Sequence, residues 1–189
     1  TLGALFVLRH KRVFDKGGQY LDSWGTGLFE FPHSIRVDRQ DNLWIVDCMH
    51  GQIYKFTPRG ELLLAIGSKG LRSDTGAKAS DGIHGYRTVT RAGGPFNLPT
   101  DVAVADSGDL FITDGYANCQ VHRFSADGKL RYSWGQPGTG PGQFTLPHGI
   151  WIVRRGQVLV ADRENDRVQV FAQSGEFINQ WPTQFVGPA

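Results

Sequence analysis

The stretch LPTDVAV at residues 98–104, which runs into DLFITD at 109–114, is a pattern that this chain repeats. FPHSIRV at 31–37 precedes NLWIVD at 42–47, and LPHGI at 146–150 precedes VLVAD at 158–162. Each copy continues into a five-residue run with alternating side chains (52–56, 120–124 and 167–171), a Gly-terminated turn and a fourth run. The residue after the proline, which is His33, Thr100 or His148, therefore holds an equivalent position in each repeat.

Four short antiparallel strands per repeat are typical of a propeller blade, which must stack on its neighbours to cover both faces. We therefore predict an all-β fold, a β-propeller of four-stranded antiparallel blades spanning residues 1–189. About four blades are present, and we expect them to be part of a six-bladed ring. The predicted blades cover residues 3–25 (partial), 29–67, 96–135 and 144–182, with an insertion loop at 68–95.

Composition excludes several classes of protein. Hydrophobic residues make up 40% of the 189 positions, so the chain is not disordered. Twenty Lys and Arg balance 18 Asp and Glu, without a basic run, so we expect no nucleic-acid partner. Nor do we expect a membrane partner, because no apolar stretch approaches the roughly 20 residues of a membrane span. The chain starts at Thr1, so we expect residues upstream, and the pairing of Cys48 with Cys119 stays open.

The repeat position of His33 and His148 predicts a metal site. The first strand of each blade lines the propeller axis, and these two histidines fall in alternate blades, with Thr100 between them. Alternate blades of a six-bladed ring are related by about 120°, so three such histidines would meet at one point and leave an open position, as in catalytic zinc sites. We expect the third histidine to lie beyond Ala189 in the sequence. The alternative is that each His is a hydrogen-bonding turn residue; His10, His50, His84 and His122 lack this register and are expected at the surface or in packing.

A length difference draws attention to Tyr116. Seven positions separate Asp114 from Val121, whereas the other two copies have six, and the extra residue lies in the loop 115–118. A phenol near a divalent cation has a lowered pKa and can act as a base, although an aromatic loop can equally pack on the next blade. Arg163 and Arg9 occupy neighbouring loop positions and would suit a carboxylate. We expect the insertion to be a lid near the channel mouth, and Asp47, Asp114 and Asp162, which recur in every full blade, to be hydrogen-bonding residues at strand ends.

These residues resemble the NHL-repeat propellers, and more narrowly the peptidyl-α-hydroxyglycine α-amidating lyase domain. The resemblance covers residues 5–181 and is strongest at 98–104 and in DGYxN (114–118), PGQFxxPH (141–148) and ADRENxR (161–167). It implies a six-bladed propeller with Zn²⁺ held by three histidines and a structural Ca²⁺ in the channel. It further implies that His33 and His148 are zinc ligands, that Tyr116 is the catalytic base, and that Arg163 and Arg9 engage the substrate carboxylate or support the tyrosine.

The implied reaction cleaves the C–N bond of a peptidyl-α-hydroxyglycine to give a peptide amide and glyoxylate, in an extracellular or periplasmic compartment. The third zinc histidine and the aspartate after it have no counterpart here, so this chain by itself would hold zinc weakly and can be inactive. Ala117 stands where animal members carry a disulfide cysteine, and the loop around Arg9 matches poorly.

Two other classes of function stay open. One is a non-catalytic NHL propeller that binds a protein through a propeller face, or a ligand, in place of the small carboxylated or peptide substrate of a lyase. The other is a lactonase-type hydrolase, which needs acidic metal ligands in the channel. Asp101 is the only obvious acid beside the ring of first-strand residues, which argues against the hydrolase.

Overall fold

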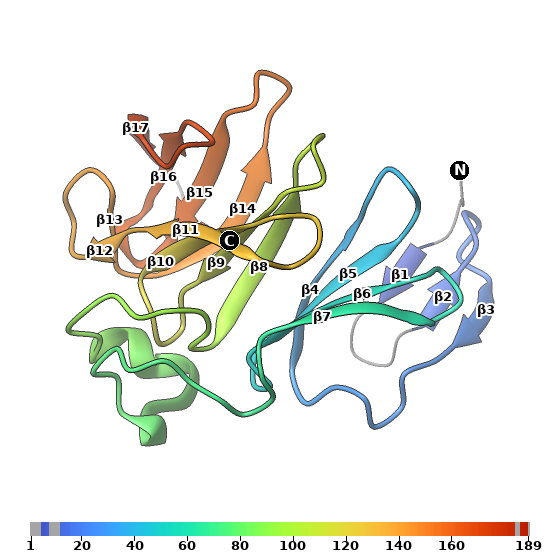
Figure 1. The fold of residues 1–189 in the computed structure, drawn as a ribbon. Coiled ribbons are helices and arrows are strands. Elements are labelled where there is room, and N and C mark those ends of the chain that lie inside the picture. Colours follow the sequence, from blue (N-terminus) through green and yellow to red (C-terminus); the bar gives the residue numbers. More distant parts are fainter. Residues whose placement is uncertain (1–4, 8–11, 184–185, 189) are drawn as a thin grey trace.

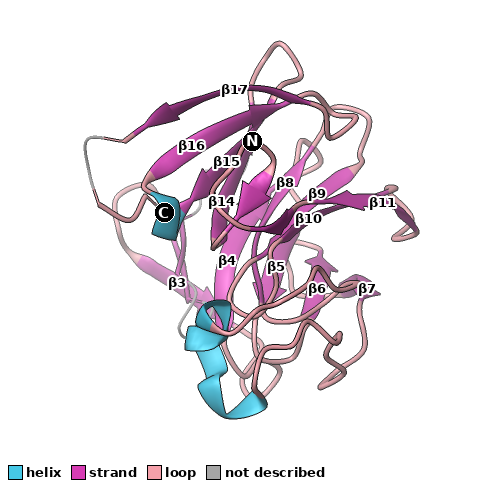
Figure 2. Cartoon of the chain, turned by 90° about the vertical axis from the view of Figure 1, so that its left-hand side faces the viewer, coloured by secondary structure: helices cyan, strands magenta, loops and turns pink. Residues whose placement is uncertain are grey.

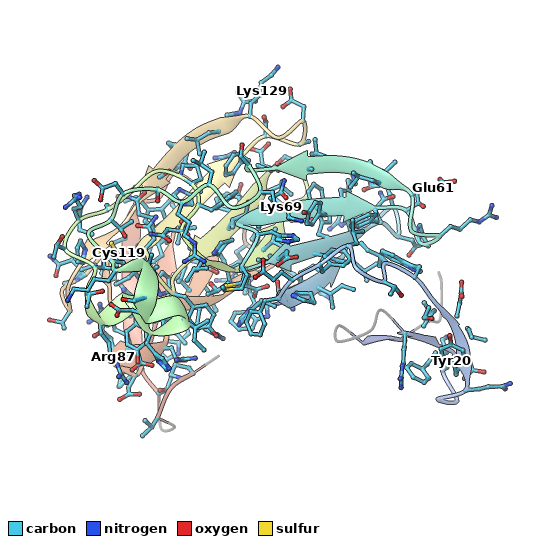
Figure 3. All side chains as sticks on the ribbon, turned by 90° about the horizontal axis from the view of Figure 1, so that it is seen from below. Tyr20, Glu61, Lys69, Arg87, Cys119 and Lys129 are labelled. Atoms are coloured by element: carbon cyan, nitrogen blue, oxygen red, sulfur yellow. The ribbon has the colours of Figure 1, made fainter. Side chains whose placement is uncertain are left out.

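The structure is a computed structural model that describes residues 5–7, 12–183 and 186–188. Three four-stranded antiparallel sheets and one three-stranded sheet lie in a fan (Figure 1). The all-β propeller architecture predicted from the repeats is confirmed. The first sheet contains β1 (Leu5–Val7), β2 (Arg12–Phe14) and β3 (Tyr20–Ser23), in that order, and Figure 3 shows it, with Tyr20, at one side of the molecule.

The three complete sheets run from an inner strand to an outer one in chain order. The strands are β4 (Pro32–Val37), β5 (Leu43–Asp47), β6 (Gln52–Phe56) and β7 (Leu62–Ile66); β8 (Pro99–Val104), β9 (Leu110–Asp114), β10 (Gln120–Phe124) and β11 (Leu130–Trp134); and β14 (Pro147–Ile152), β15 (Val158–Asp162), β16 (Arg167–Phe171) and β17 (Phe177–Pro182). Second strands are buried almost throughout, whereas the fourth strands are largely exposed. This gradient follows from position, because an inner strand is covered on both faces by neighbouring sheets.

Apolar side chains fill the spaces between consecutive sheets. Phe96, Val102 and Phe124 pack with Trp44 and Ile53 between the β4–β7 and β8–β11 sheets. A second cluster joins the β8–β11 sheet to the β14–β17 sheet and includes Phe111, Val121, Phe144, Ile150 and Phe171. Each blade therefore depends on the next for its core, as expected of a repeat fold.

One contact between blades recurs at the outer end of the sheets. The side chains of Trp24, Ile66 and Trp134, at or just after the end of the last strand of a sheet, lie against the turn glycine of the next blade. A Cβ atom on Gly175 would lie 3.1 Å from the Trp134 ring, and one on Gly60 would lie 2.8 Å from the Trp24 ring. The glycines of these turns therefore serve a packing need in addition to their positive φ angles.

The insertion forms an irregular segment at one end of the sheets (Figures 1 and 2). It contains the 3₁₀ segment η2 (Ala79–Arg87), and Figure 3 shows Arg87 on this segment. Another short segment pairs β12 (Gln136–Pro137) with β13 (Gln143–Phe144) before the last blade, whose second strand is followed by the 3₁₀ turn η3 (Arg163–Asn165). Within the described part of the chain, no helix is long and apolar enough to cross a membrane.

Candidate functional site

A β-bulge sets the orientation of the residue after the proline in each complete blade. The register between the first two strands shifts between Pro32 and Ser34, between Pro99 and Asp101, and between Pro147 and Gly149. The residues passed over in the pairing are His33, Thr100 and His148. A bulged residue is left out of the ladder and its side chain is re-aimed, which explains how three residues inside regular strands can serve one shared space.

The structure brings His33, His148 and Tyr116 together. The two imidazole centroids are 4.9 Å apart, although 115 positions separate the residues in sequence. Nε2 of His33 lies 2.9 Å from the Tyr116 hydroxyl oxygen, and Nε2 of His148 lies 3.1 Å from the same atom. The inner strands that carry the imidazoles lie on either side of β8. One phenol thus links two ring nitrogens that face a common point.

The hydrogen bonds define where the protons reside. Nδ1 of His33 lies 2.7 Å from the carbonyl oxygen of Thr100, which can only accept, so Nδ1 carries the proton. In the neutral ring Nε2 then has a free lone pair and accepts the Tyr116 hydroxyl proton. That hydroxyl has a single proton, so the Nε2–H of His148 donates to the Tyr116 oxygen.

Both imidazoles are neutral at pH 7. Burial lowers the pKa of His33, with the Arg163 charge adding to the effect, while the hydrogen bond to Thr100 and the Asp101 charge partly oppose it. Burial, followed by the charges of His33 and Arg163, lowers the pKa of His148 to about 4. A neutral imidazole whose other ring nitrogen donates to a backbone carbonyl is the form in which His binds metals, and His33 has this form.

Tyr116 is 7% exposed, and Arg163 lies beside it. The guanidinium carbon is 5.9 Å from the centroid of the phenol ring. Burial raises the pKa of Tyr116 and the Arg163 charge opposes that rise, but the pKa remains above its ordinary value. Tyr116 is therefore a neutral phenol at pH 7 in this environment, and a role as base needs additional positive charge close by. Arg163 also pairs with Glu164, 3.0 Å away.

The insertion holds the Tyr116 loop in place. The Thr75 hydroxyl donates to the carbonyl of Ala117 at 2.6 Å, and the Asn118 side chain accepts from the backbone of Gly93 at 3.1 Å. Gly85 of η2 packs so closely on Ala117 that a Cβ there would lie 2.9 Å from the Cβ of Ala117. The segment predicted as a lid thus packs on the loop that carries Tyr116.

The recurring aspartates support the backbone next to the bulges. Asp47 accepts from the backbone N–H of Phe31 at 2.9 Å, Asp114 from that of Asn97 at 2.8 Å and Asp162 from that of Thr145 at 3.1 Å. All three carboxylates are buried, and each bond joins the end of a second strand to the segment before the first. They therefore act as the strand-end hydrogen-bonding groups that their recurrence indicated.

Of the remaining histidines and cysteines, Cys48 packs with Tyr116 in one buried cluster. His50 and His122 are buried next to Asp47 and Asp114, at 3.0 and 3.2 Å, and His84 is exposed on η2. Cys48 and Cys119 are separate buried thiols, and burial raises the pKa of Cys119 to about 12. Arg9, like His10, falls outside the described residues.

The residues present fit a metal ion in part. The described residues contain no group of three His, Cys, Asp or Glu side chains able to hold one. The Nε2 atoms of the two neutral imidazoles are directed to one point, as two nitrogen ligands of zinc would be. Nε2 of His33 carries no proton and can bind a metal directly, whereas His148 would bind one after its proton moves from Nε2 to Nδ1. The channel beside them forms a cavity of about 290 Å³ lined by His33, Arg36, Asp101, His148 and Trp151, among others. Asp101 in that cavity is paired with Arg36 at 2.5 Å.

Sequence reasoning missed Thr113 of β9, which contacts β8 of its own sheet and β14 of the next sheet. Its hydroxyl lies 2.8 Å from that of Thr100 and 3.3 Å from the carbonyl of His148. A signal was available, because the matching residues of the other two copies are Val46 and Ala161. A polar residue at a buried position that is otherwise apolar calls for a hydrogen-bonding explanation.

The fold and its repeats define this chain as a β-propeller segment. The NHL repeat family matches residues 96–124 and 144–171. The chain is 36% identical over 183 residues to the peptidyl-α-hydroxyglycine α-amidating lyase 1 of Drosophila melanogaster, covering 90% of this chain and 30% of that protein. It is 29% identical over 189 residues to the human NHL repeat-containing protein 3, covering 94% of this chain and 50% of that protein. Over most of its length the chain thus resembles part of a peptidyl-α-hydroxyglycine α-amidating lyase.

A solved structure, titled streptogramin B lyase structure, superimposes with a TM-score of 0.63 at 15% identity. The match covers 96% of this chain and 52% of that one. At this identity the similarity concerns the fold alone. This chain spans half or less of the length of the two curated relatives described above.

Proposed function

We propose that this chain carries part of a zinc-dependent lyase site that cleaves the C–N bond of a peptidyl-α-hydroxyglycine to a peptide amide and glyoxylate. The observation that carries the proposal is the Tyr116 hydroxyl, held between Nε2 of His33 and Nε2 of His148 at 2.9 and 3.1 Å. The similarity to the Drosophila lyase supports the choice of substrate.

Zinc would be held through the Nε2 atoms of His33 and His148, and when bound it polarises the substrate hydroxyl and lowers the pKa of a nearby phenol. The chain prepares these ligands by keeping both imidazoles neutral and by holding Nδ1 of His33 on the Thr100 carbonyl. Arg163 adds a positive charge beside Tyr116, which further favours the phenolate.

In the proposed reaction, Tyr116 as phenolate takes the proton of the substrate hydroxyl. The oxygen electrons form the carbonyl of glyoxylate as the C–N bond breaks, and the amide nitrogen leaves with the bonding pair and gains a proton. Nothing is oxidised or reduced by an outside reagent. Arg163 would bind the substrate carboxylate, because a guanidinium can make two parallel hydrogen bonds to one carboxylate.

The experiment measures glyoxylate and amide released from an N-acyl-α-hydroxyglycine, with zinc added, by this chain and by the longest natural protein that contains it. Tyr116→Phe is expected to lower the rate by about 100-fold or more, because it removes the proton acceptor. His84→Ala, which changes an exposed imidazole on η2, is the matched control and is expected to keep full activity. Full activity in Tyr116→Phe, or no glyoxylate from either wild-type protein, would contradict the proposal.

A second function is favoured by the similarity to the human NHL repeat-containing protein 3, which extends over 94% of this chain. In that case the propeller is a scaffold that binds a protein or ligand without catalysis. Metal content and activity that are unchanged in both His33→Ala and His148→Ala would favour the scaffold.

A further inference from the structure

We propose that Thr100, together with Thr113, is a positioning residue that sets the spacing and the tautomers of the two imidazoles. The inference rests on the proposed function, since the spacing matters for a ligand shared by His33 and His148. Thr100 occupies the bulge position of the one complete blade that has no histidine there. It is fully buried.

Thr100 contacts both neighbouring blades. Toward β4, its carbonyl oxygen accepts the Nδ1 proton of His33 at 2.7 Å. The bulge leaves this carbonyl available, because a bulged residue is not paired in the ladder. Toward β14, its hydroxyl lies 2.9 Å from the carbonyl oxygen of Pro147, the residue before His148. A single residue thus bridges the two strands that carry the imidazoles.

Thr113 completes the bridge. The Thr100 and Thr113 hydroxyl oxygens are 2.8 Å apart, and each hydroxyl has one proton. The Thr100 proton has the carbonyl of Pro147 and the Thr113 oxygen as acceptors, and the Thr113 proton has the Thr100 oxygen and the carbonyl of His148. The backbone N–H of Asp101 in turn donates to Thr113 at 3.1 Å. Donors and acceptors therefore form one chain from β9 through β8 to β14.

The sequence supports the pairing of the two threonines. The blades with a histidine at the bulge have Val46 or Ala161 where this blade has Thr113. A buried hydroxyl needs hydrogen-bond partners, and Thr113 finds them in the Thr100 hydroxyl and in the backbone of Asp101 and His148. The two polar residues occur together in the blade that lies between the histidines.

The test reads the histidine tautomers by long-range ¹H–¹⁵N NMR on the metal-free, histidine-labelled chain, and zinc affinity in a separate titration. In the wild type we expect the Nδ1–H form of His33 and the Nε2–H form of His148. In Thr100→Val the bond to Pro147 is lost, and we expect the His148 ring to shift away from Tyr116. His148 should then show a mixture of tautomers, and zinc, which needs both Nε2 atoms at one point, should bind about 10-fold to 100-fold more weakly. Thr100→Ser keeps the hydroxyl and is expected to restore both properties.

Ser125→Ala is the matched control, because it removes a buried hydroxyl in the β10–β11 turn of the same blade. It is expected to leave tautomers and zinc affinity unchanged. Should Thr100→Val not fold, Thr113→Val removes the hydroxyl that is hydrogen-bonded to Thr100 and is expected to show the same tautomer mixture. Wild-type tautomers in a folded Thr100→Val or in Thr113→Val would overturn the proposal. The tautomer measurement needs neither zinc nor activity, so its failure is distinct from failure of the proposed lyase function.

Discussion

At the scale of single residues, the site depends on the β-bulge in each inner strand. The bulge adds one residue to the strand and turns the side chain of that residue toward a shared space. The bulges at His33 and His148 place the two rings edge to face, with centroids 4.9 Å apart and an interplanar angle of 80°. Two like cations so close would repel, and burial adds to that cost. Their neutral state is therefore a consequence of the same geometry that brings them together.

Arg163 provides a residue-scale prediction. If its guanidinium binds the substrate carboxylate, Arg163→Gln should raise KM for an N-acyl-α-hydroxyglycine by about 10-fold to 100-fold, the loss expected for a charge-assisted hydrogen bond of about 1.5–3 kcal/mol. KM is measured from steady-state rates of glyoxylate release. Arg155→Gln, at an exposed arginine in the β14–β15 turn, is the control. An unchanged KM in Arg163→Gln would exclude the carboxylate role.

The histidine register was predictable because the repeat aligns His33 and His148 with each other, and equivalent positions in a propeller share an axis. The contact between Tyr116 and both rings was not, since it depends on how the seven-position loop folds under the insertion. The bulges could not be predicted from the sequence either, because a one-residue shift in strand pairing leaves the spacing of the motif unchanged. In the sequence, Thr113 stood out only because it is polar, whereas the matching residues of the other two copies, Val46 and Ala161, are apolar.

At the scale of elements, the strands follow from alternation and from turn chemistry, and individual turns add their own stabilisation. In the β4–β5 turn, Asp38 accepts from the backbone N–H groups of Gln40 and Asn42, each at 2.9 Å. It also accepts from the indole of Trp44 at 3.1 Å and pairs with Lys55 at 3.3 Å. Ala105 and Val153 hold the corresponding turn positions in the other two blades, so this polar network belongs to one blade.

The Asp38 network gives a pH-dependent prediction. Burial by itself would raise the pKa of Asp38, but its hydrogen bonds from Asn42, Trp44 and Gln40 outweigh burial and hold the pKa below its usual value. A depressed carboxyl pKa stabilises the fold above the unfolded-state value of about 3.9, and this stabilisation is lost as the pH falls through the folded-state pKa. Asp38→Asn should therefore lower the free energy of unfolding by about 1–3 kcal/mol at pH 7 and by less below pH 4.

Urea denaturation at both pH values checks the Asp38 prediction. Asp106→Asn is a suitable control, because this carboxylate is exposed and paired only at the surface, with Arg39. A loss of stability in Asp38→Asn that is equal at both pH values would mean that the charge of Asp38 plays no part.

The contact between blades gives a second prediction at this scale. Gly175 and Gly142 both have positive φ, of 85° and 74°, but only Gly175 faces a neighbouring ring, that of Trp134. Alanine at either position strains the backbone, and at Gly175 it also displaces the indole. Gly175→Ala should therefore destabilise the protein by about 1–3 kcal/mol more than Gly142→Ala, measured by urea denaturation. Equal losses would show that the Trp134 contact is unimportant for stability.

At the scale of the whole molecule, the sheets are joined both by apolar clusters and by polar contacts near the axis. Asp101 of β8 is an example, since its carboxylate accepts from Arg36 of β4 at 2.5 Å and from the backbone N–H of Ile150 of β14 at 3.1 Å. Thr100, the preceding residue, contacts the same two strands. The β8 strand therefore links the two histidine-bearing blades at successive positions, and a ligand shared by those blades would add a further connection between them.

This arrangement leads to a prediction about zinc and stability. A metal that binds the folded chain through His33 and His148, and not the unfolded chain, stabilises it by RT ln(1 + [Zn]/Kd), or about 1.4 kcal/mol at tenfold excess over Kd. For a chain of this length, that corresponds to a rise in Tm of roughly 3–6 °C. Differential scanning calorimetry with and without zinc would measure the shift, and a chelator should reverse it. The shift should disappear in the double variant His33→Ala/His148→Ala and persist in His84→Ala, whose imidazole is exposed on η2. An equal shift in the double variant would mean that zinc binds at another place and does not link the two blades through these histidines.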